Sequence, residues 1–432
     1  MSEQIPSPGN PDNSSQPIYL GSEENVGTPT NIPRRNRLGK AWRVIFLAST
    51  VIGIIALTLL LINIINGSAG YMAIEYEIEP ESLAVNGTPL QELPNAALIQ
   101  ILQENLTRNR FRTLDRQSPM EQRTQEDLVS LVYDNVIEPK VQNTWPLFDS
   151  LAREAEIREI AKTEYPNAEL FFKIWFTQDL WKLPQSSNPL LAGVRTAILG
   201  SLWIISITIL FALPIGTGAA IFLEEYARDT WINRTIQTNI NNLAGVPSII
   251  YGMLGLAVFA RAFSVLTSGA LFNIPNADPE NGRTILSAGL TLALLILPVV
   301  IINAQEAIRA VPNSLREASY GLGATKWQTI WAHVLPNSLA GIMTGAILSI
   351  SRAFGETAPL VVIGAATFIT FDPQNMFSKF TALPIQIYQW TARPQAEFRN
   401  LAAAAILVLL ILQLSINAIA IILRNRYSRR LV

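Results

Sequence analysis

The chain has 432 residues, of which 49% are hydrophobic and 15% are charged, and its formal net charge is −1. Soluble domains carry about 25% charged residues, so this composition excludes an ordinary soluble protein. The chain contains no cysteine, which excludes disulfide bonds, thiolate metal sites and a cysteine nucleophile.

Hydrophobic residues gather in long segments, and this pattern predicts an all-α, polytopic membrane protein. A helix needs about 20 mainly apolar residues to cross the hydrocarbon core. Six segments meet this requirement, at 44–66, 192–222, 240–263, 284–303, 339–370 and 400–423. The first forms a separate span, and the other five form a predicted membrane core over 189–424.

Basic residues at both ends of this set predict its orientation, because cytoplasmic flanks of spans are enriched in Lys and Arg. They precede the first span and follow the last: Arg34, Arg35, Arg37, Lys40, Arg43, Arg424, Arg426, Arg429 and Arg430. We therefore expect both termini in the cytoplasm. Residues 1–43, rich in Ser, Pro, Asn and Gly up to residue 33, are expected to be a disordered tail, and 425–432 a short basic tail.

Residues 34–70 also have the order of a secretory signal peptide, with a basic stretch, an apolar stretch and small residues at 67–70. The apolar run from Val44 to Ile65 is longer than the h-region of a signal peptide, which has about 7 to 15 residues. An uncleaved membrane anchor is the favoured interpretation.

Residues 67–188 form a polar region that this topology places outside the membrane. Apolar residues at helical spacing predict helices at 96–106, 128–137 and 147–160, so we expect a compact helical domain. Its role is not visible in the sequence. The domain also has four arginines that could attract an anion or an acidic partner surface, although a solvated helix face explains them better. They are Arg108, Arg110, Arg112 and Arg116.

A polar loop at 304–338, between two spans on the cytoplasmic side, carries the plainest functional pattern. It contains Glu317, Ala318 and Ser319, then Gly323, and ends with Leu335 and Pro336. We expect two short helices, broken at Gly321 and Gly323 and stopped by Pro336. Such an elbow is suited to transmit motion to a soluble partner. His333 is expected to pack beside that partner rather than to bind a metal.

Enzyme chemistry has little support in this chain. It has no Gly-x-x-x-x-Gly-Lys-Ser/Thr phosphate loop, so we expect no ATPase site of its own. A single histidine excludes the His-Glu-x-x-His zinc signature, and no Gly-x-Ser-x-Gly nucleophile elbow is present. No catalytic residue, metal site or cofactor is predicted.

Arg352 and Glu356 place two opposite charges four residues apart in the fifth apolar segment, where they are expected to share a helix face. Charges at this depth are costly and usually pair with each other or line a polar pathway. One interpretation is a structural ion pair. The other is an anion site, since the planar guanidinium suits tetrahedral oxyanions and Glu356 can orient it.

The loop residues 317–336 resemble the Glu-Ala-Ala loop of ABC importer permeases, which docks on the ATP-binding subunit. Ser319 replaces the second alanine of that pattern, and His333 replaces a usual isoleucine. Residues 352–360, Arg-Ala-Phe-Gly-Glu-Thr-Ala-Pro-Leu, are similar to the segment of phosphate importer permeases of the PstA type. Further similar stretches lie at 242–252, 213–216 and 224–227.

This resemblance runs from about residue 169 to the C-terminus and implies the type I ABC importer permease fold in a cell inner membrane. It implies phosphate import by alternating access, with Arg352, Glu356 and Thr357 on the substrate path. The implied partners are a PstC-like second permease, two copies of a PstB-type ATPase and a PstS-type phosphate-binding protein. Residues that couple to the ATPase would be Glu317, Ala318, Gly323, Leu335 and Pro336.

Two parts of the chain lie outside the resemblance, namely the insertion after the first span and the amino-terminal tail. An arginine does not choose among tetrahedral oxyanions, so sulfate or molybdate remains an alternative substrate. A membrane-anchored sensor or scaffold is an alternative from another class. A passive channel or ion-coupled transporter would need no elbow at 317–336.

Overall fold

The computed structural model describes residues 32–84, 88–117, 119–274, 278–365, 368–369 and 371–428. Residues 1–31 of the expected disordered tail therefore lie outside the described residues, whereas residues 32–43 are helical rather than disordered. The chain divides into two units, 1–61 and 62–432, and each is described by itself. The first unit contains most of helix α1, Ile32–Gly67.

The expectation of a helical membrane protein is confirmed. In the described residues, five helices are long and apolar enough to cross a membrane, at Arg34–Gly67, Arg195–Tyr226, Ile285–Arg309, Lys326–Gly355 and Ala396–Arg426. A sixth candidate is a pair of helices bent by 105°. Within these regions the regular helices are α8 (Arg195–Ile221), α9 (Trp231–Ala244), α10 (Ser248–Gly255), α12 (Ile285–Arg309), α15 (Leu335–Gly355) and α18 (Ala396–Ser428).

Two of the expected apolar segments are broken rather than continuous. The segment 240–263 begins inside α9 and crosses the 105° bend before α10, because Pro247 disfavours a helical residue before it. The segment 339–370 is interrupted where α15 ends at Gly355 and a short helix, α16 (Ala358–Ile363), begins. In both places a proline at or near the first turn of the new helix is compatible with its start.

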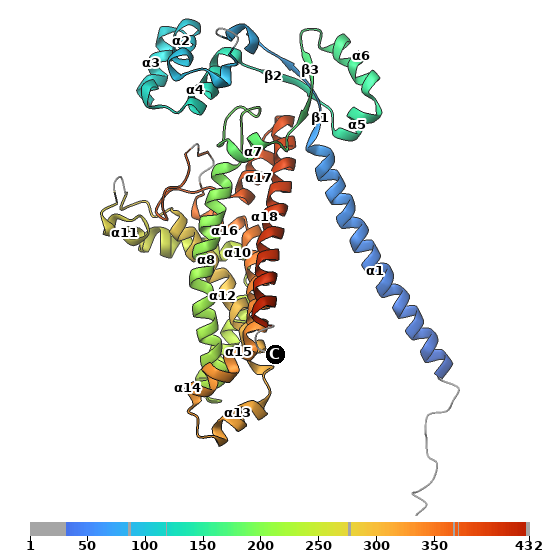
Figure 1. Ribbon diagram of the computed structural model, residues 1–432, viewed down its shortest axis with the longest axis vertical. Helices are drawn as coiled ribbons and strands as arrows, with labels where there is room; N and C mark the ends of the chain where they lie inside the picture. Colours follow the sequence, from blue (N-terminus) through green and yellow to red (C-terminus); the bar gives the residue numbers. More distant parts are fainter. Residues whose placement is uncertain are drawn as a thin grey trace, which may run out of the picture. The chain divides into compact units, whose positions relative to one another are not determined.

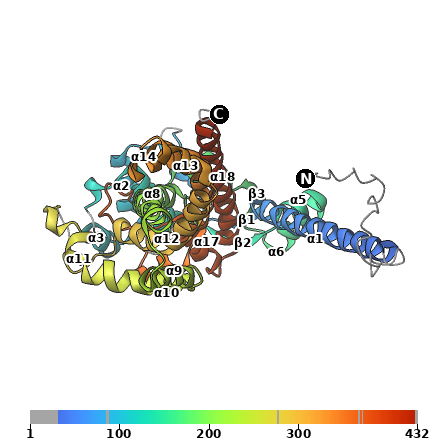
Figure 2. The same cartoon turned by 90° about the horizontal axis from the view of Figure 1, so that it is seen from below.

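Helices α8 and α12 pack closely at the centre of the membrane helices, with the other helices around them (Figure 2). Small residues permit this approach: a Cβ on Gly289 of α12 would lie only 2.6 Å from Cγ2 of Ile207 on α8. The Thr208 hydroxyl donates to the carbonyl of Gly289 at 3.1 Å. Buried apolar clusters continue along this contact and join it to α15 and α16.

Residues 69–188 form a mixed domain, called here the sheet domain. The expected helices are present, but the structure adds a three-stranded antiparallel sheet of order β2-β1-β3 that the sequence analysis did not predict. The strands are β1 (Ala69–Glu75), β2 (Lys140–Thr144) and β3 (Glu169–Ile174). The helices are α2 (Asn95–Asn105), α3 (Arg108–Gln117), α4 (Gln125–Val132), α5 (Leu147–Ala152), α6 (Glu154–Glu164) and α7 (Gln178–Lys182).

The sheet domain has two apolar cores. One is local to the lobe of α2 and α4 and contains Leu98, Leu102 and Leu128. The other joins β1 to the membrane helices, because Met72 and Ile74 belong to the same buried cluster as residues of α8, α18 and the helix α17 (Leu383–Thr391). The sheet domain is therefore continuous with the membrane helices at one end of the second unit (Figure 1).

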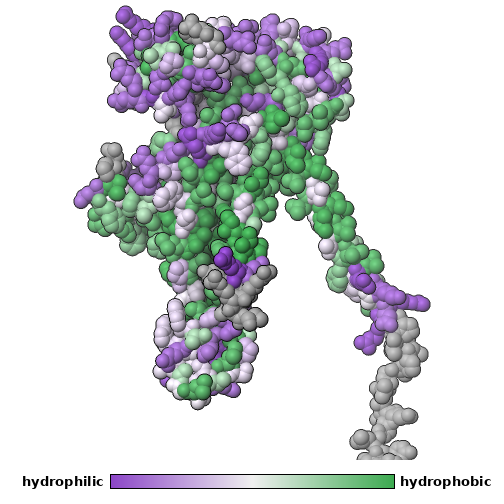
Figure 3. Space-filling model, viewed as in Figure 1, coloured by the Kyte–Doolittle hydropathy of each residue, from purple (hydrophilic) through white to green (hydrophobic). Residues whose placement is uncertain are grey.

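The opposite end of the second unit carries the short helices α13 (Asn313–Gly321) and α14 (Lys326–Thr329). Hydrophobic side chains cover the helices between this end and the sheet domain, while both ends are more hydrophilic (Figure 3). One further short helix, α11 (Ser264–Thr267), precedes the loop to α12. This distribution indicates a membrane-spanning region between two hydrophilic ends.

Candidate functional site

The loop between α12 and α15 forms an elbow, defined here as residues 310–334. Helix α12 ends at Arg309, and α13 leads into a turn at Gly323, whose φ of +82° lies in the left-handed region that favours glycine. Thr325 then caps α14 in a capping box with Gln328. The two expected short helices and the glycine turn between them are present.

The expectation that Pro336 stops the second short helix is wrong. A π-helical turn at Ile330–Val334 follows α14, and α15 continues directly from Leu335 with Pro336 in its first turn. A proline is tolerated there because the first N–H groups of a helix have no intrahelical acceptor. Leu335 and Pro336 therefore join the elbow to the membrane helix without a break.

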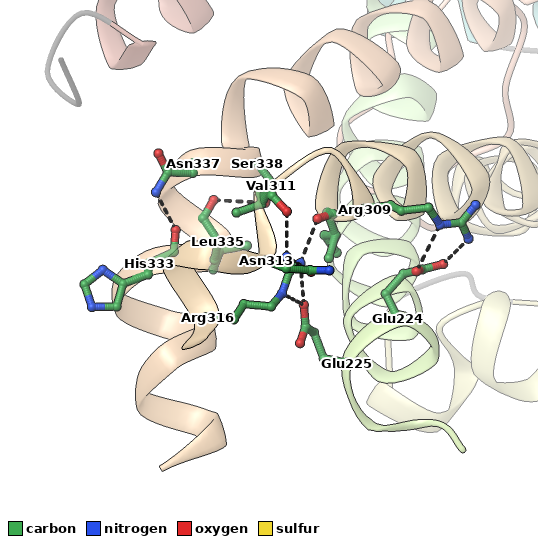
Figure 4. A network of polar contacts seen from close by, with 11 residues as sticks. Glu224, Glu225, Arg309, Val311, Asn313, Arg316, His333, Leu335, Asn337 and Ser338 are labelled. Carbon is green, nitrogen blue, oxygen red and sulfur yellow. Dashed lines mark hydrogen bonds and ion pairs between the residues drawn. The ribbon is translucent and has the colours of Figure 1, made fainter. Parts of the chain in front are cut away.

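A buried cluster of polar contacts fixes the base of the elbow (Figure 4). The guanidinium of Arg316 donates to Glu225 Oε1 through Nη2 at 2.9 Å and Nε at 3.1 Å. It also donates to the carbonyls of Val311 at 2.6 Å and Ile308 at 2.9 Å. The side chains of Arg316 and Glu225 are only 14% and 6% exposed. This one arginine thus joins α13, the end of α12 and the helical turn that follows α8.

A second ion pair lies beside this cluster, between Arg309 at the end of α12 and Glu224, at 2.6 Å. The Arg309 side chain is 61% exposed, so water screens this pair more than the buried one. Neither pair was predicted from the sequence. The sequence shows only two adjacent glutamates after one apolar segment and two arginines after another. This pattern does not indicate that the glutamates and arginines pair.

The distal part of the elbow presents both polar and apolar side chains to the surface. Glu317 and Ala318 are exposed on α13, and Leu322 in the turn is 91% exposed. Trp327 and Trp331 are also exposed and stack at 5.7 Å between ring centroids. An exposed apolar group of this kind typically marks an interaction site.

Ser319, in the second alanine position of the resembled pattern, is buried. Its hydroxyl lies 2.9 Å from that of Thr329, so it links α13 to α14 across the turn. His333 is exposed on the π-helical turn. Only its backbone carbonyl is drawn in contact in Figure 4, where it accepts from the Asn337 side-chain amide at 2.7 Å.

Arg352 and Glu356 are brought together at the end of α15, with Arg352 Nε 3.4 Å from Glu356 Oε1. Glu356 does not continue the helix, as the sequence analysis assumed, but follows its last residue in an extended conformation. The Arg352 side chain is 46% exposed and shares the exposed face of α15 with Leu348, one turn earlier. Thr357 follows directly and precedes the first residue of α16.

Packing on two sides fixes this helix break. A Cβ on Gly252 of α10 would lie 2.7 Å from Cα of Pro359, so α10 and α16 are in backbone contact. On the other side, Ser351 donates to the Asn417 side chain at 2.6 Å, and its carbonyl accepts from Gln413 at 3.3 Å. Both partners lie on α18, and the sequence analysis did not identify them.

Residues 212–431 match the family model described as binding-protein-dependent transport system inner membrane component. The Bacillus subtilis probable ABC transporter permease protein YqgI is 32% identical over 52% of this chain and 76% of its own length. The Mycobacterium tuberculosis phosphate transport system permease protein PstA 1 is 35% identical over 59% of this chain and 78% of its own. The Pasteurella multocida phosphate transport system permease protein PstC is 36% identical over 44% of this chain and 62% of its own.

Proposed function

Because this chain belongs to the family of binding-protein-dependent transport system inner membrane components, we propose that it is the permease subunit of an ATP-driven inorganic phosphate importer. Relatives named as phosphate transport system permeases, of both the PstA and the PstC kind, support the substrate. The similarity of residues 352–360 to the PstA segment supports the PstA kind. In this proposal phosphate moves into the cytoplasm by alternating access.

The observation that carries the proposal is the half-exposed arginine at the break between α15 and α16. A guanidinium offers five N–H donors in a planar fork, and a single carboxylate at 3.4 Å does not fill that fork. Arg352 would bind the phosphate oxygens, and Glu356 would orient the guanidinium. Thr357, in the same irregular segment, would add a hydroxyl. Irregular backbone at membrane depth is tolerated where it lines a cavity.

The exposure of Arg352 supports a phosphate pathway that lies between two permease subunits. Its helix face also presents Leu348 to the surface, and a charged side chain facing lipid would be costly. A second, PstC-like permease packed on this face would enclose Arg352 and complete the polar path. The pair would then surround the phosphate from both sides.

The elbow would dock on a PstB-type ATPase, with two copies serving the two permeases. Glu317 and Ala318 would contact the ATPase, and Gly323 would shape the turn. Leu335 and Pro336 would pass the motion into α15, while the buried contacts of Arg316 would pass it to α8 and α12. This chain would take no part in ATP hydrolysis. Differential contact of the elbow with the two ATPase states is what would drive the change.

A PstS-type binding protein would deliver phosphate on the side of the sheet domain. This places the elbow and both termini in the cytoplasm and the sheet domain outside, in agreement with the basic residues that flank the first and last spans. The sheet domain then lies where it can affect docking of the binding protein.

ATP-driven phosphate uptake in proteoliposomes containing the complete transporter tests this proposal. We expect Arg352→Ala to abolish uptake while assembly and ATPase activity persist, and Arg352→Lys to restore it only in part, since the planar fork is lost. Arg234→Ala is the matched control, because that arginine lies on exposed α9 and pairs with Asp229. Normal uptake in Arg352→Ala would mean that the Arg352–Glu356 ion pair has only a structural role. Sulfate or molybdate uptake by the unaltered transporter would overturn the phosphate assignment.

A further inference from the structure

An apolar patch is exposed on the surface of the sheet domain. It consists of Phe148 and Leu151 on α5 and Phe172 and Ile174 on β3. All four side chains are exposed, Leu151 by 68% and Ile174 by 51%. Side chains of this kind scattered singly need no explanation, but a group of large apolar residues on one domain marks an interaction surface.

The patch lies at the end of the first membrane span. The backbone N–H of Phe148 donates to the Asn66 side chain at 2.8 Å, and Asn66 belongs to the last turn of α1. Ile174 is the register partner of Ala69, the first residue of β1. Figure 1 shows α5 next to the point where α1 passes into β1. Because the apolar run of the span ends at Ile65, the patch is held at the boundary of the hydrocarbon core.

The charged groups of α5 lie on another face of that helix. Asp149 pairs with Arg153 at 3.3 Å, roughly opposite Leu151 around the helix. This pair is exposed, so water covers that side of α5. The Glu154–Arg158 pair on α6 instead borders the patch, because both residues contact Tyr71, whose ring packs edge-on against Phe172. The α5 segment is thus amphipathic, with Phe148 and Leu151 on one side and Asp149 and Arg153 on the other.

We propose that this patch rests on the lipid headgroup region and seats the sheet domain on the membrane surface. Continuity with the end of the first span favours lipid over a protein partner, because the patch begins where that span leaves the hydrocarbon core. Apolar faces of interfacial helices are buried about 5 to 10 Å into the headgroup boundary, and Phe and Leu side chains are typical of those faces. The seated domain would keep a fixed height and tilt above the permease.

Nitroxide labelling tests this directly, since the chain has no cysteine and each introduced cysteine is the only label site within it. Leu151→Cys and Ile174→Cys would be labelled in the complete transporter, assembled with partner subunits made cysteine-free, in nanodiscs of phosphatidylcholine and phosphatidylglycerol. Collision rates with oxygen, which enters lipid, and with a water-soluble nickel chelate would then be measured. Leu57→Cys, inside the first span, is the lipid reference, and Glu104→Cys, exposed on α2 of the sheet domain, is the water reference.

We expect oxygen collisions to exceed nickel collisions at positions 151 and 174, at a depth of about 5 to 10 Å. Arg153→Cys, two residues away on the charged side of α5, should match the water reference. Equal values at 151 and 153, both water-like, would overturn the proposal. Loss of collisions with both reagents at 151 and 174 would also overturn it, because a protein partner would then cover the patch.

Discussion

Replacement of Arg316 by alanine should strongly destabilise the elbow. The change removes both hydrogen bonds to Glu225 and those to the carbonyls of Ile308 and Val311. It leaves a carboxylate whose side chain is only 6% exposed without its cation. Breaking a buried ion pair by removing one partner costs about 3 to 5 kcal/mol, and we expect a loss of stability of this order.

Arg309→Ala supplies the matched comparison on the neighbouring pair. Its bond to Glu224 is shorter, at 2.6 Å, and the arginine is 61% exposed, although the Glu224 side chain is only 16% exposed. Exposed ion pairs contribute about 0 to 1 kcal/mol, and this pair is exposed on the arginine side only, so we expect a loss of stability between that value and the loss in Arg316→Ala. The two variants therefore compare an ion pair that water reaches with one that it does not.

The assay is denaturant unfolding of the purified transporter in detergent, combined with ATPase and uptake measurements. Arg316→Ala should unfold at lower denaturant and hydrolyse ATP with reduced uptake, because the elbow is no longer held to α8 and α12. The double variant Arg316→Ala, Glu225→Gln should recover part of the stability, since no buried charge remains. An equal, small effect of Arg316→Ala and Arg309→Ala would refute this reasoning.

Three further outcomes are expected. Gly323→Ala should cost about 1 to 2 kcal/mol of stability in the elbow, since the φ of Gly323 is +82°, and it should lower the uptake per ATP hydrolysed. Gly321→Ala should do neither. Equal coupling of uptake to ATP hydrolysis in both variants would contradict the role of the turn. Gly252→Ala should lower the free energy of unfolding by about 1 to 3 kcal/mol, because the added Cβ meets the backbone of α16. Gly218→Ala should be tolerated, since no atom lies within 4 Å of the added Cβ. Similar losses of stability in the two variants would refute the contact. Burial raises the pKa of the Asp134 carboxyl in the folded protein above its ordinary value of 3.8. The stability that the protonated carboxyl contributes is therefore fully present below pH 3.8 and is lost as the pH rises through the folded pKa. Asp134→Asn should thus raise the thermal midpoint near neutral pH and leave it unchanged in acid; an unchanged neutral midpoint would contradict this.

Much of the membrane region could be predicted because each span is a local, continuous apolar pattern. The elbow helices and the turn at Gly323 were equally local, since capping residues and glycine act within a few positions. The same reasoning placed Arg352 and Glu356 within reach of each other, four residues apart. What it did not predict was the helix end at Gly355, because a short apolar helix follows and the hydropathy of the segment remains high.

The sheet and the base of the elbow depend on partners far away in the chain. Strand β1 pairs with β2 and β3, and each of these is short and lacks a clear alternation of apolar and polar residues. Arg316 and Glu225 come from different helical segments. Local periodicity contains no information on either pairing. The prediction for Pro336 was wrong for another reason. A proline in the interior of a helix breaks it, but a proline in the first turn is tolerated.

The apolar cluster shared by β1 and the last membrane helix has a consequence for biosynthesis. The lobe around Leu98 and Leu128 has contacts close in sequence and can become compact soon after it is synthesised. Met72 and Ile74, by contrast, pack with Leu401 and Ala405 near the other end of the chain. Because loop closure over such a separation comes late, these side chains of β1 cannot be fully buried until α18 has been inserted. Quality control during synthesis would therefore meet an apolar face of the sheet that stays partly exposed until translation is nearly complete, although β2 and β3 already flank β1.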